Sequence, residues 1–323
     1  MNEKINFPAE DLASNRDGFG DALVEAGRLN KNIVVATADL SESTRVEKFA
    51  KEFPDRFLDV GVAEQNLVAV ASGLAAAGKI AFATSYAAFS PGRNWEQMRT
   101  TISYNDQPVK IIGSHGGLSV GPDGATHQAL EDIALMRVLP NMTVLAPGDY
   151  EEARKATMAA IGHPGPIYLR LSRDKTPKFT TTETPFEIGE ALLLREGSDV
   201  TIVSTGTITY EALLAAQALA MEETSVEVLH MPTVKPLDTT SLLNSVRKTG
   251  CVVTVEDHQI AGGLGGAVAE FLSESHPVLI RRVGVQDRFG QSGRVNELYA
   301  EYEMDSYAII KNVKEILARR GKN

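Results

Sequence analysis

Two stretches of the sequence carry side chains that could handle a polar substrate. Residues 114–127 (SHGGLSVGPDGATH) hold two of the six histidines and one aspartate among four glycines and a proline. Glu64 stands in the first turn of a long helical pattern that follows the short apolar run 57–60. Imidazole can donate and accept hydrogen bonds, and it titrates near neutral pH. Local physics alone gives Glu64 a simpler role, because a carboxylate in the first turn stabilises the helix dipole.

Three kinds of site could use residues 114–127. A serine hydrolase needs a Gly-x-Ser-x-Gly turn, and residues 113–117 read Gly-Ser-His-Gly-Gly, so the spacing excludes this class. A metal site could use His115, Asp123 and His127, but their spacing matches no compact zinc signature, and the glycine-rich loop is expected to be flexible. The third possibility is a pair of neutral histidines that hydrogen-bond a polar substrate. Simple exposure of both side chains on a loop stays open beside it.

Strand and helix patterns alternate along the chain, which predicts parallel α/β sheets flanked by helices. In the first half we expect strands at 33–38, 57–60, 80–84, 109–113, 142–145 and, as the last one, 167–171, with helices at 16–29, 64–77, within 87–104, 128–139 and 147–161. In the second half we expect strands at 200–204, 225–229, 251–255 and 278–283, with helices near 210–221, 240–249, 263–272 and 306–319. Ligands of open parallel sheets lie at the carboxyl ends of the strands, which is where Glu64 and residues 114–127 fall.

A change in composition predicts where the chain divides. The segment 174–187 is rich in Thr, Lys and Pro, and it separates an expected domain at 1–180 from one at 181–323. Residues 1–15 are polar and are expected on the surface. The glycines at 262–266 are not followed by the Lys-Ser/Thr of a P-loop, so we expect them to serve packing or a subunit contact. His230 is expected to be structural, and His258 to approach the site entrance or a contact between subunits.

Composition limits the classes of protein that fit. With 323 residues and 43% apolar residues, the chain can build two sizeable cores. Its net charge of −10 and the lack of a Lys/Arg cluster argue against nucleic acid or an anionic membrane as the partner. The single cysteine, Cys251, excludes an internal disulfide and a multi-cysteine metal site. The N-terminus has no apolar signal core and no apolar run reaches about 20 residues, so we expect a cytoplasmic protein without a membrane span.

Four motifs occur in order along the chain, and their combination resembles the C-terminal half of transketolases. They are DVGVAEQN at 59–66, GPDGATHQ at 121–128, YLRLSR at 168–173 and VKPLD at 234–238. The resemblance covers essentially the whole chain, as a pyrimidine-binding domain followed by a transketolase C-terminal domain, and the small chain resembles the B subunit of a split transketolase. It implies a thiamine-diphosphate-dependent enzyme that transfers a two-carbon ketol unit from a ketose phosphate to an aldose phosphate.

The sequence departs from full-length transketolases by an absence. It lacks the Gly-Asp-Gly motif with which those enzymes bind Mg²⁺ and the cofactor diphosphate. The resemblance therefore implies a separate N-terminal subunit with the pyrophosphate domain and the Mg²⁺ ligands, in an α2β2 assembly. It also implies self-association through the pyrimidine-binding and C-terminal domains. Permanent interfaces of this kind are large and apolar, and the helices flanking Glu64 and at 93–104 are the candidate surface.

The same resemblance assigns the cofactor contacts. Glu64 matches the family's catalytic glutamate, whose carboxyl group hydrogen-bonds the aminopyrimidine ring and helps to activate the cofactor. Phe89 is the expected stacking partner of that ring, with Tyr86 as the second option, because residues 83–96 carry fewer aromatics than long transketolases. His127 is expected to act in catalysis by contacting hydroxyl groups near the reacting carbonyl.

The sugar phosphate contacts are carried over in the same way. Asp123 would bind the C2 hydroxyl group of the acceptor, and His115 would lie toward the phosphate end. Arg173, Arg16 and Ser43 match phosphate contacts, and a guanidinium group suits bidentate phosphate binding. The simpler alternatives are a turn aspartate before a glycine for Asp123 and a solvated residue at a helix start for Arg16.

Other enzymes and one other class of protein remain as alternatives. Half of a deoxyxylulose-phosphate synthase or the beta subunit of a 2-oxoacid dehydrogenase would share Glu64 and the fold. A non-catalytic interaction subunit could also keep the fold, because fold alone does not give function.

Overall fold

The first of two large sheets is built mainly from the N-terminal half of the chain. Its strands are β2 (Ile33–Thr37), β3 (Phe57–Asp59), β4 (Ile80–Tyr86), β5 (Lys110–Ser114), β6 (Thr143–Leu145), β7 (Ile167–Arg170) and β12 (Thr233–Lys235). They lie in the order β12-β6-β7-β5-β4-β2-β3, and only β12 is antiparallel to its neighbour. The computed structural model describes residues 1–321.

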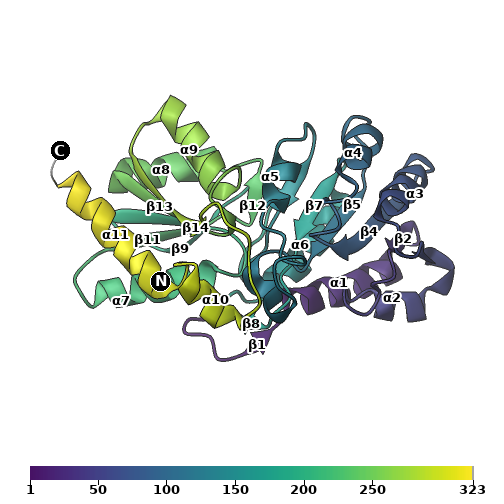
Figure 1. The fold of residues 1–323 in the computed structure, drawn as a ribbon, viewed down its shortest axis with the longest axis horizontal. Coiled ribbons are helices and arrows are strands. Elements are labelled where there is room, and N and C mark those ends of the chain that lie inside the picture. Colours follow the sequence, from purple (N-terminus) through teal and green to yellow (C-terminus); the bar gives the residue numbers. More distant parts are fainter. Residues whose placement is uncertain (322–323) are drawn as a thin grey trace.

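The second large sheet lies beside the first along the longest axis of the molecule (Figure 1). Its strands are β9 (Leu192–Arg195), β10 (Val200–Ser204), β11 (Val226–His230), β13 (Cys251–Gln259) and β14 (Leu279–Val285). They lie in the order β14-β13-β10-β11-β9, and only β9 is antiparallel. A short antiparallel pair joins β1 (Leu12–Ala13) to β8 (Thr176–Pro177). The predicted fold class of two open, mostly parallel α/β sheets is confirmed.

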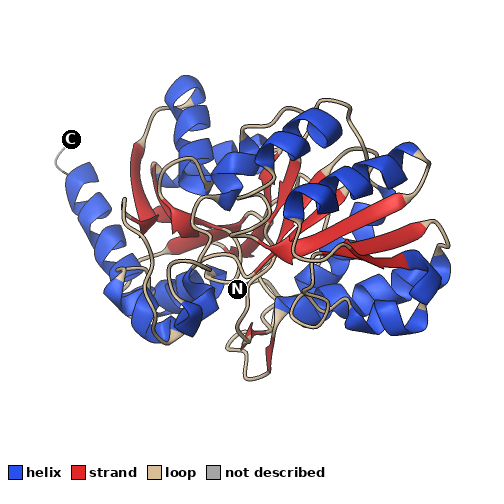
Figure 2. Cartoon of the chain, turned by 45° about the vertical axis from the view of Figure 1, so that its right-hand side comes forward, coloured by secondary structure: helices blue, strands red, loops and turns tan. Residues whose placement is uncertain are grey.

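Helices cover both faces of these sheets (Figure 2). In the first unit they are α1 (Asn15–Leu29), α2 (Glu47–Glu52), α3 (Glu64–Ala76), α4 (Trp95–Gln97), α5 (Asp132–Arg137) and α6 (Tyr150–Gly162), with the shorter turns η1 (Pro54–Arg56), η2 (Met98–Ser103) and η3 (Leu118–Asp123). In the second unit they are α7 (Thr209–Ala220), α8 (Thr239–Thr249), α9 (Leu264–Ser275), α10 (Val295–Glu301) and α11 (Ser306–Arg320). Burial on both faces explains why central strands such as β2 are continuous apolar runs.

One strand crosses from the second half of the chain to the first sheet. The strand expected at 167–171 is present as β7, but β12, which was not predicted, adds to the edge of this sheet beside β6. Thr233 lies opposite Leu145, and Lys235 lies opposite Val144. With only three residues, β12 is too short to show a periodic pattern.

Several other sequence expectations also need correction. The elements α2, α10 and β9 were not predicted, and the expected helix at 128–139 is helical only over the residues of α5. Most of residues 1–15 lie on the surface, as expected, but the segment also makes backbone contacts with the rest of the chain. The Asn2 amide donates to the Leu194 carbonyl (2.9 Å), the Asn6 amide donates to the Phe179 carbonyl (2.8 Å), and β1 pairs with β8. The N-terminal segment therefore touches both units.

The glycine-rich segment 114–127 is also unlike its prediction. Residues 114–121 are all buried, where a flexible loop was expected, although the short turns of η3 are interrupted by a kink at Gly121 and are not regular, as predicted. The second unit covers it, because α10 packs against η3. Glycine content predicts a departure from ordinary strands and helices, but it does not reveal whether the segment is covered.

The two units are joined by a shared apolar core. Side chains from the first unit (Ile133 and Met136) and from the second (Leu264 and Val268) are buried in one cluster. Burial of apolar surface between units favours a fixed rather than a mobile arrangement. Within residues 1–321, no helix has both the length and the apolar character that crossing a bilayer requires.

Candidate active site

The predicted site residues gather at the carboxyl ends of the parallel strands of the first sheet. Glu64 follows β3, Tyr86 and Phe89 lie at and after the end of β4, His115 follows β5, and Arg173 follows β7. Because these strands are parallel, their carboxyl ends share one edge of the sheet, where α/β folds bind ligands. The topology therefore brings together residues that are more than 100 positions apart in the sequence.

Glu64 is the first residue of α3 and is only 4% exposed. Nη1 of Arg93 donates to both carboxylate oxygens, at 3.1 and 3.2 Å. The amide side chain of Asn94 donates to the backbone carbonyl of Glu64 at 2.9 Å, which fixes the start of the helix against the segment after β4. The site thus holds a buried carboxylate with one cationic neighbour, and that cation was not predicted from the sequence.

Four rings form a continuous aromatic column next to this carboxylate. The rings of Phe89 and Tyr86 are stacked with centroids 5.7 Å apart, and Tyr86 stacks on His115 at 3.8 Å. His127 lies edge-on to Phe89 at 5.4 Å and to Tyr86 at 6.3 Å. The Arg93 guanidinium covers the Phe89 ring at 4.1 Å, so Phe89 occupies the end of the column toward Glu64.

His115 is buried and neutral. Nη1 of Arg16 can only donate, so Nε2 of His115 accepts that hydrogen bond (3.3 Å), and Nδ1–H donates to the Ser114 hydroxyl group (2.8 Å). Burial, with help from the Arg16 charge, lowers the pKa of His115 to about 2. Its backbone φ of 60° lies in the left-handed region, and such strain is often found at functional sites.

Arg16 supports several parts of the site at once. Ser14 caps α1 by accepting from the Arg16 amide (3.3 Å), which places the guanidinium under the strand ends. That group donates to the carbonyls of Ser43 (2.7 Å) and Arg173 (2.6 Å) as well as to His115. Burial and the Arg45 charge lower the pKa of Arg16 to about 10. Ser43 thus meets Arg16 through its backbone, and most of the Arg16 donors are already used inside the protein.

Arg173 ties the strand ends to the glycine-rich segment. Its Nη1 donates to the Val120 carbonyl at 2.6 Å and to Asp123 Oδ1 at 3.1 Å. Asp123 belongs to η3 and remains exposed, so the pair lies at the mouth of the site. An exposed pair of this kind adds little stability, which leaves both groups able to exchange partners with a ligand.

A cleft of about 770 Å³ opens from Arg173 toward the second unit. Five cationic side chains and three acidic ones line it. The cations are Arg16, Arg45, Arg173, Lys175 and Arg294, and the acids are Asp17, Asp174 and Glu211. In a chain with a net charge of −10, a local excess of positive charge marks a place suited to an anion.

The structure therefore brings all nine predicted site residues into one connected region. Sequence reasoning missed Arg93, Arg45 and Arg294, which reach the site from other segments. Arg93 stands 29 positions from Glu64, and Arg294 comes from the second unit. In the sequence, Arg93 is recognisable only as a basic residue in a segment that follows a strand. Many residues of the chain fit that description, so it did not mark Arg93 as a site residue.

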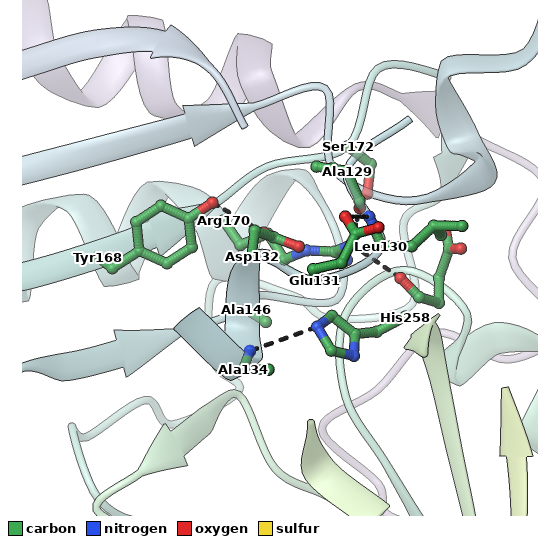
Figure 3. Close-up of polar contacts among 12 residues, drawn as sticks. Ala129, Leu130, Glu131, Asp132, Ala134, Ala146, Tyr168, Arg170, Ser172 and His258 are labelled. Carbon is green, nitrogen blue, oxygen red and sulfur yellow. Dashed lines mark hydrogen bonds and ion pairs between the residues drawn. The ribbon is translucent and has the colours of Figure 1, made fainter. Parts of the chain in front are cut away.

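The remaining histidines of interest lie outside this region. His230 is buried between Glu152 (2.7 Å) and Thr209 (2.9 Å), in agreement with its expected structural role. His258 is also buried, and its Nε2 accepts from the Ala134 amide at 3.3 Å (Figure 3). The expectation that His258 approaches the entrance or a contact between subunits is wrong, since it lies at the contact between this chain's own two units.

The glycine turn before α9 is a packing feature. Both carboxylate oxygens of Glu256 accept from amides of this helix start, Leu264 N–H at 2.7 Å and Gly265 N–H at 2.8 Å. The N-terminal amides of α9 therefore already bind the carboxylate of this chain's own Glu256. Among residues 1–321, no group of three or more His, Cys, Asp or Glu side chains is placed to hold a metal ion.

Comparison with known proteins agrees with this geometry. Residues 12–178 match the family described as transketolase, pyrimidine binding domain, and residues 189–309 match transketolase, C-terminal domain. The chain is 42% identical, over 95% of both lengths, to the 6-deoxy-6-sulfo-D-fructose transketolase subunit SqwH of Clostridium sp. strain MSTE9. It is 36% identical to one subunit of the apulose-4-phosphate transketolase of Phocaeicola vulgatus, over 96% of this chain and 100% of that one.

A solved structure is similar over nearly the whole chain. It is described as a split gene transketolase, inactive beta4 tetramer, and it superposes with a TM-score of 0.89 at 45% identity. The match covers 94% of this chain and 98% of that one. The protein is therefore a member of the transketolase family that corresponds to its C-terminal half, a pyrimidine-binding domain followed by a transketolase C-terminal domain, as in subunits of split transketolases.

Proposed function

We propose that this chain is the pyrimidine-domain subunit of a split transketolase that transfers a two-carbon ketol unit from a ketose phosphate to an aldose phosphate. The observation that carries the proposal is the connected array of Glu64, the aromatic column and the Asp123–Arg173 pair at one sheet edge. Its relatives are transketolase-type enzymes, whose family depends on thiamine diphosphate.

The residues present fit one end of that cofactor. An aminopyrimidine ring needs a carboxyl group at a ring nitrogen and an aromatic surface to stack on. Glu64 and Phe89 offer these two groups, and the Arg93 guanidinium contacts both of them. Tyr86 is enclosed between Phe89 and His115, which favours Phe89 as the stacking ring. When bound, thiamine diphosphate supplies the carbanion chemistry that moves a ketol unit.

Glu64 is the group that would exchange a proton with the aminopyrimidine. Its carboxyl group is buried, and its hydrogen-bond partner Arg93 is half-exposed and therefore free to move aside. Loss of the Arg93 contact would leave the buried carboxyl group free to hydrogen-bond a ring nitrogen and exchange a proton with it. Before the cofactor binds, Arg93 would thus supply the hydrogen bonds that the buried Glu64 carboxylate needs.

The sugar phosphate would lie along the aromatic column and into the cationic cleft. His127 would contact hydroxyl groups near the reacting carbonyl, and neutral His115 lies deeper, toward Arg16. Asp123 would accept from a sugar hydroxyl group. Its present partner Arg173 makes its side-chain contacts within residues 1–321 through Nη1, so Nε and Nη2 would bind the terminal phosphate. A relative named for a sulfonated sugar indicates that the terminal anion can differ within the family.

The other half of the cofactor would be held by a second chain. We propose a pyrophosphate-domain subunit that supplies the Mg²⁺ ligands and docks beside Glu64, in an assembly of two copies of each chain. The names of the relatives, which are subunits, and the exposed surroundings of Glu64 support this arrangement. Self-association of this chain would complete the assembly.

Reconstitution tests the proposal. The purified chain is mixed with the pyrophosphate-domain subunit, Mg²⁺ and thiamine diphosphate, and ketol transfer from xylulose 5-phosphate to ribose 5-phosphate is measured. We expect activity only when both chains are present. Turnover of pyruvate in place of the sugar phosphates would instead indicate a synthase or 2-oxoacid dehydrogenase. Failure of every partner to restore turnover would favour a non-catalytic subunit.

A further inference from the structure

A buried carboxylate of the second unit holds residues 117–129 of the first, called here the sugar-binding segment because the proposed function places the sugar phosphate against it. Asp257, near the end of β13, is 4% exposed. Its Oδ1 accepts from the Leu118 amide at 2.8 Å, and its Oδ2 accepts from the Ser119 amide at 3.3 Å. The hydroxyl group of Tyr299, on α10, donates to Oδ2 at 3.1 Å. Asp257 therefore satisfies the first two amides of η3 and connects them to two elements of the second unit.

Close approach of this carboxylate requires a glycine on the segment. Gly117 adopts φ of 80°, and a Cβ atom at this position would lie only 2.1 Å from Asp257 Oδ2. Any side chain would therefore push the carboxylate away, besides straining the backbone. The glycine content of the segment, which predicted flexibility, here permits a tight contact instead.

Asp257 is connected by hydrogen bonds to the groups that face the sugar phosphate. Ser119 Oγ donates to the Gly116 carbonyl at 2.7 Å and accepts from the Arg173 amide at 3.3 Å. The next residue, Val120, accepts from the Arg173 guanidinium. The backbone at 118–120 thus sets the position of Arg173 and, through it, of Asp123.

The far end of the same segment is fastened to the same strand. Nη2 of Arg170 donates to the Asp257 carbonyl (2.8 Å) and to the Ala129 carbonyl (3.2 Å), while its Nε donates to Asp132 (2.8 Å). Figure 3 shows Arg170 between Ala129 and Asp132, with Tyr168 donating to the same carboxylate. The segment between positions 117 and 129 is therefore held at both ends by β13 and cannot shift as a free loop.

From these contacts we infer that Asp257 is a positioning residue of the C-terminal domain that fixes the sugar-binding segment, and with it Arg173 and Asp123, for sugar phosphate binding. The inference rests on the proposed function, since it assigns to that site a residue that does not touch the substrate. An isosteric amide at this position would keep the size but would place an NH₂ group against a donor. One of the amides of η3 would then lose its acceptor inside the protein.

The neighbouring residue provides a matched control. Glu256 is as buried as Asp257, lies on the same strand and accepts from two backbone amides, but it holds α9 and not η3. Glu256→Gln and Asp257→Asn should therefore cost similar stability, while only the second should disturb the sugar-binding segment. Tyr299→Phe removes one donor to Asp257 and serves as a milder variant that should fold even if Asp257→Asn does not.

Kinetics of the reconstituted enzyme give the first test. For Asp257→Asn we expect the KM for xylulose 5-phosphate to rise about tenfold, because small misplacements of binding groups are costly. The KM for hydroxypyruvate, a short donor without phosphate, should stay within about twofold, since this donor does not reach Arg173. Tyr299→Phe should change the first KM in the same direction by less, and Glu256→Gln should leave the ratio of the two KM values unchanged. Equal losses for both donors would overturn the inference.

Hydrogen exchange of the chain alone gives a second test that needs neither partner nor activity. The amides of Leu118 and Ser119 should exchange about tenfold faster in Asp257→Asn than in the unchanged chain or in Glu256→Gln. Tyr299→Phe should accelerate the same amides more weakly. Unchanged exchange in folded Asp257→Asn would overturn the inference even if the enzyme were active. An inactive reconstituted pair would refute the proposed function, while the exchange result would still decide whether Asp257 holds the segment.

Discussion

The two halves of the candidate site differ in how completely this chain encloses them. The half around His115 and Asp257 is closed, since residues 114–121 are buried under the second unit. The half around Glu64 is open, because β3 is an edge strand and Val62, two residues before Glu64, is 71% exposed. An edge strand next to a buried carboxylate is a surface that proteins normally cover. Under the proposed function, the sugar-binding half would be completed within the chain and the cofactor-binding half by a second chain.

The largest expected effect comes from removing the carboxylate of the open half. Glu64→Gln should lower kcat of ketol transfer in the reconstituted enzyme by about 10³-fold, because the amide cannot exchange a proton. The control is Glu274→Gln, which alters an exposed carboxylate on α9 of the second unit and should leave kcat unchanged. A nearly normal kcat in the Glu64→Gln variant would show that the open half has no catalytic role.

The next effect concerns association through the open half. Ala69 is an exposed residue of α3, on the helix that begins with Glu64. Ala69→Arg should weaken binding of the pyrophosphate-domain subunit by about 100-fold, since it places a charge in the expected interface. Ala218→Arg, at an exposed alanine of α7 in the other unit, is the matched control. Titration calorimetry measures the affinity of each variant for the pyrophosphate-domain subunit. Equal affinities for the two variants would show that the partner does not bind at α3.

A smaller effect is expected in the closed half. Arg173→Lys should raise the KM for xylulose 5-phosphate by about tenfold with little change in kcat, because an ammonium group cannot bind phosphate through two parallel hydrogen bonds. Arg319→Lys, on the exposed end of α11, should have no effect. Steady-state kinetics with both variants check this prediction. A change confined to kcat would argue that Arg173 acts elsewhere than on the terminal anion.

The smallest effect concerns how the closed half responds to pH. The folded state keeps His115 neutral because its pKa is lowered to about 2, whereas the unfolded chain takes up a proton below about pH 6.5. Stability should therefore fall as the pH drops below that value, by up to about 1.4 kcal/mol per pH unit from this residue. Replacement by a group that does not titrate, His115→Asn, should remove that part of the slope. Urea unfolding between pH 5 and 7 measures how the free energy of unfolding changes with pH in the unchanged chain and in His115→Asn. The same pH dependence in both would show that His115 is protonated in the folded state.

The same comparison shows what the sequence could and could not predict. Glu64 at a strand-to-helix turn and the histidines of segment 114–127 were visible, because local periodicity and glycine placement mark strand ends. Arg93 and Asp257 were not, since their roles depend on contacts across 29 and 139 positions of sequence. The three-residue strand β12 was missed for a related reason, because it is defined by its partner β6 and not by its own pattern.

Burial was the property hardest to predict from residue type. Four glycines suggested a flexible segment at 114–127, yet Gly117 is needed for close contact with a carboxylate. His258 carried a polar side chain that suggested an entrance or a subunit contact, yet it is buried between the chain's own units. In both places a residue from a distant element decides the environment, and such tertiary contacts leave no local pattern.

The most direct test of the central claim, that this chain supplies one open half of a shared cofactor site, is a thiamine diphosphate titration in the presence of Mg²⁺. Binding is measured by calorimetry for this chain alone, for the pyrophosphate-domain subunit alone and for their mixture. We expect the mixture to bind at least about tenfold more tightly than either chain, with the gain reduced by Glu64→Gln. Equally tight binding by this chain alone, or a gain that does not depend on Glu64, would contradict the claim.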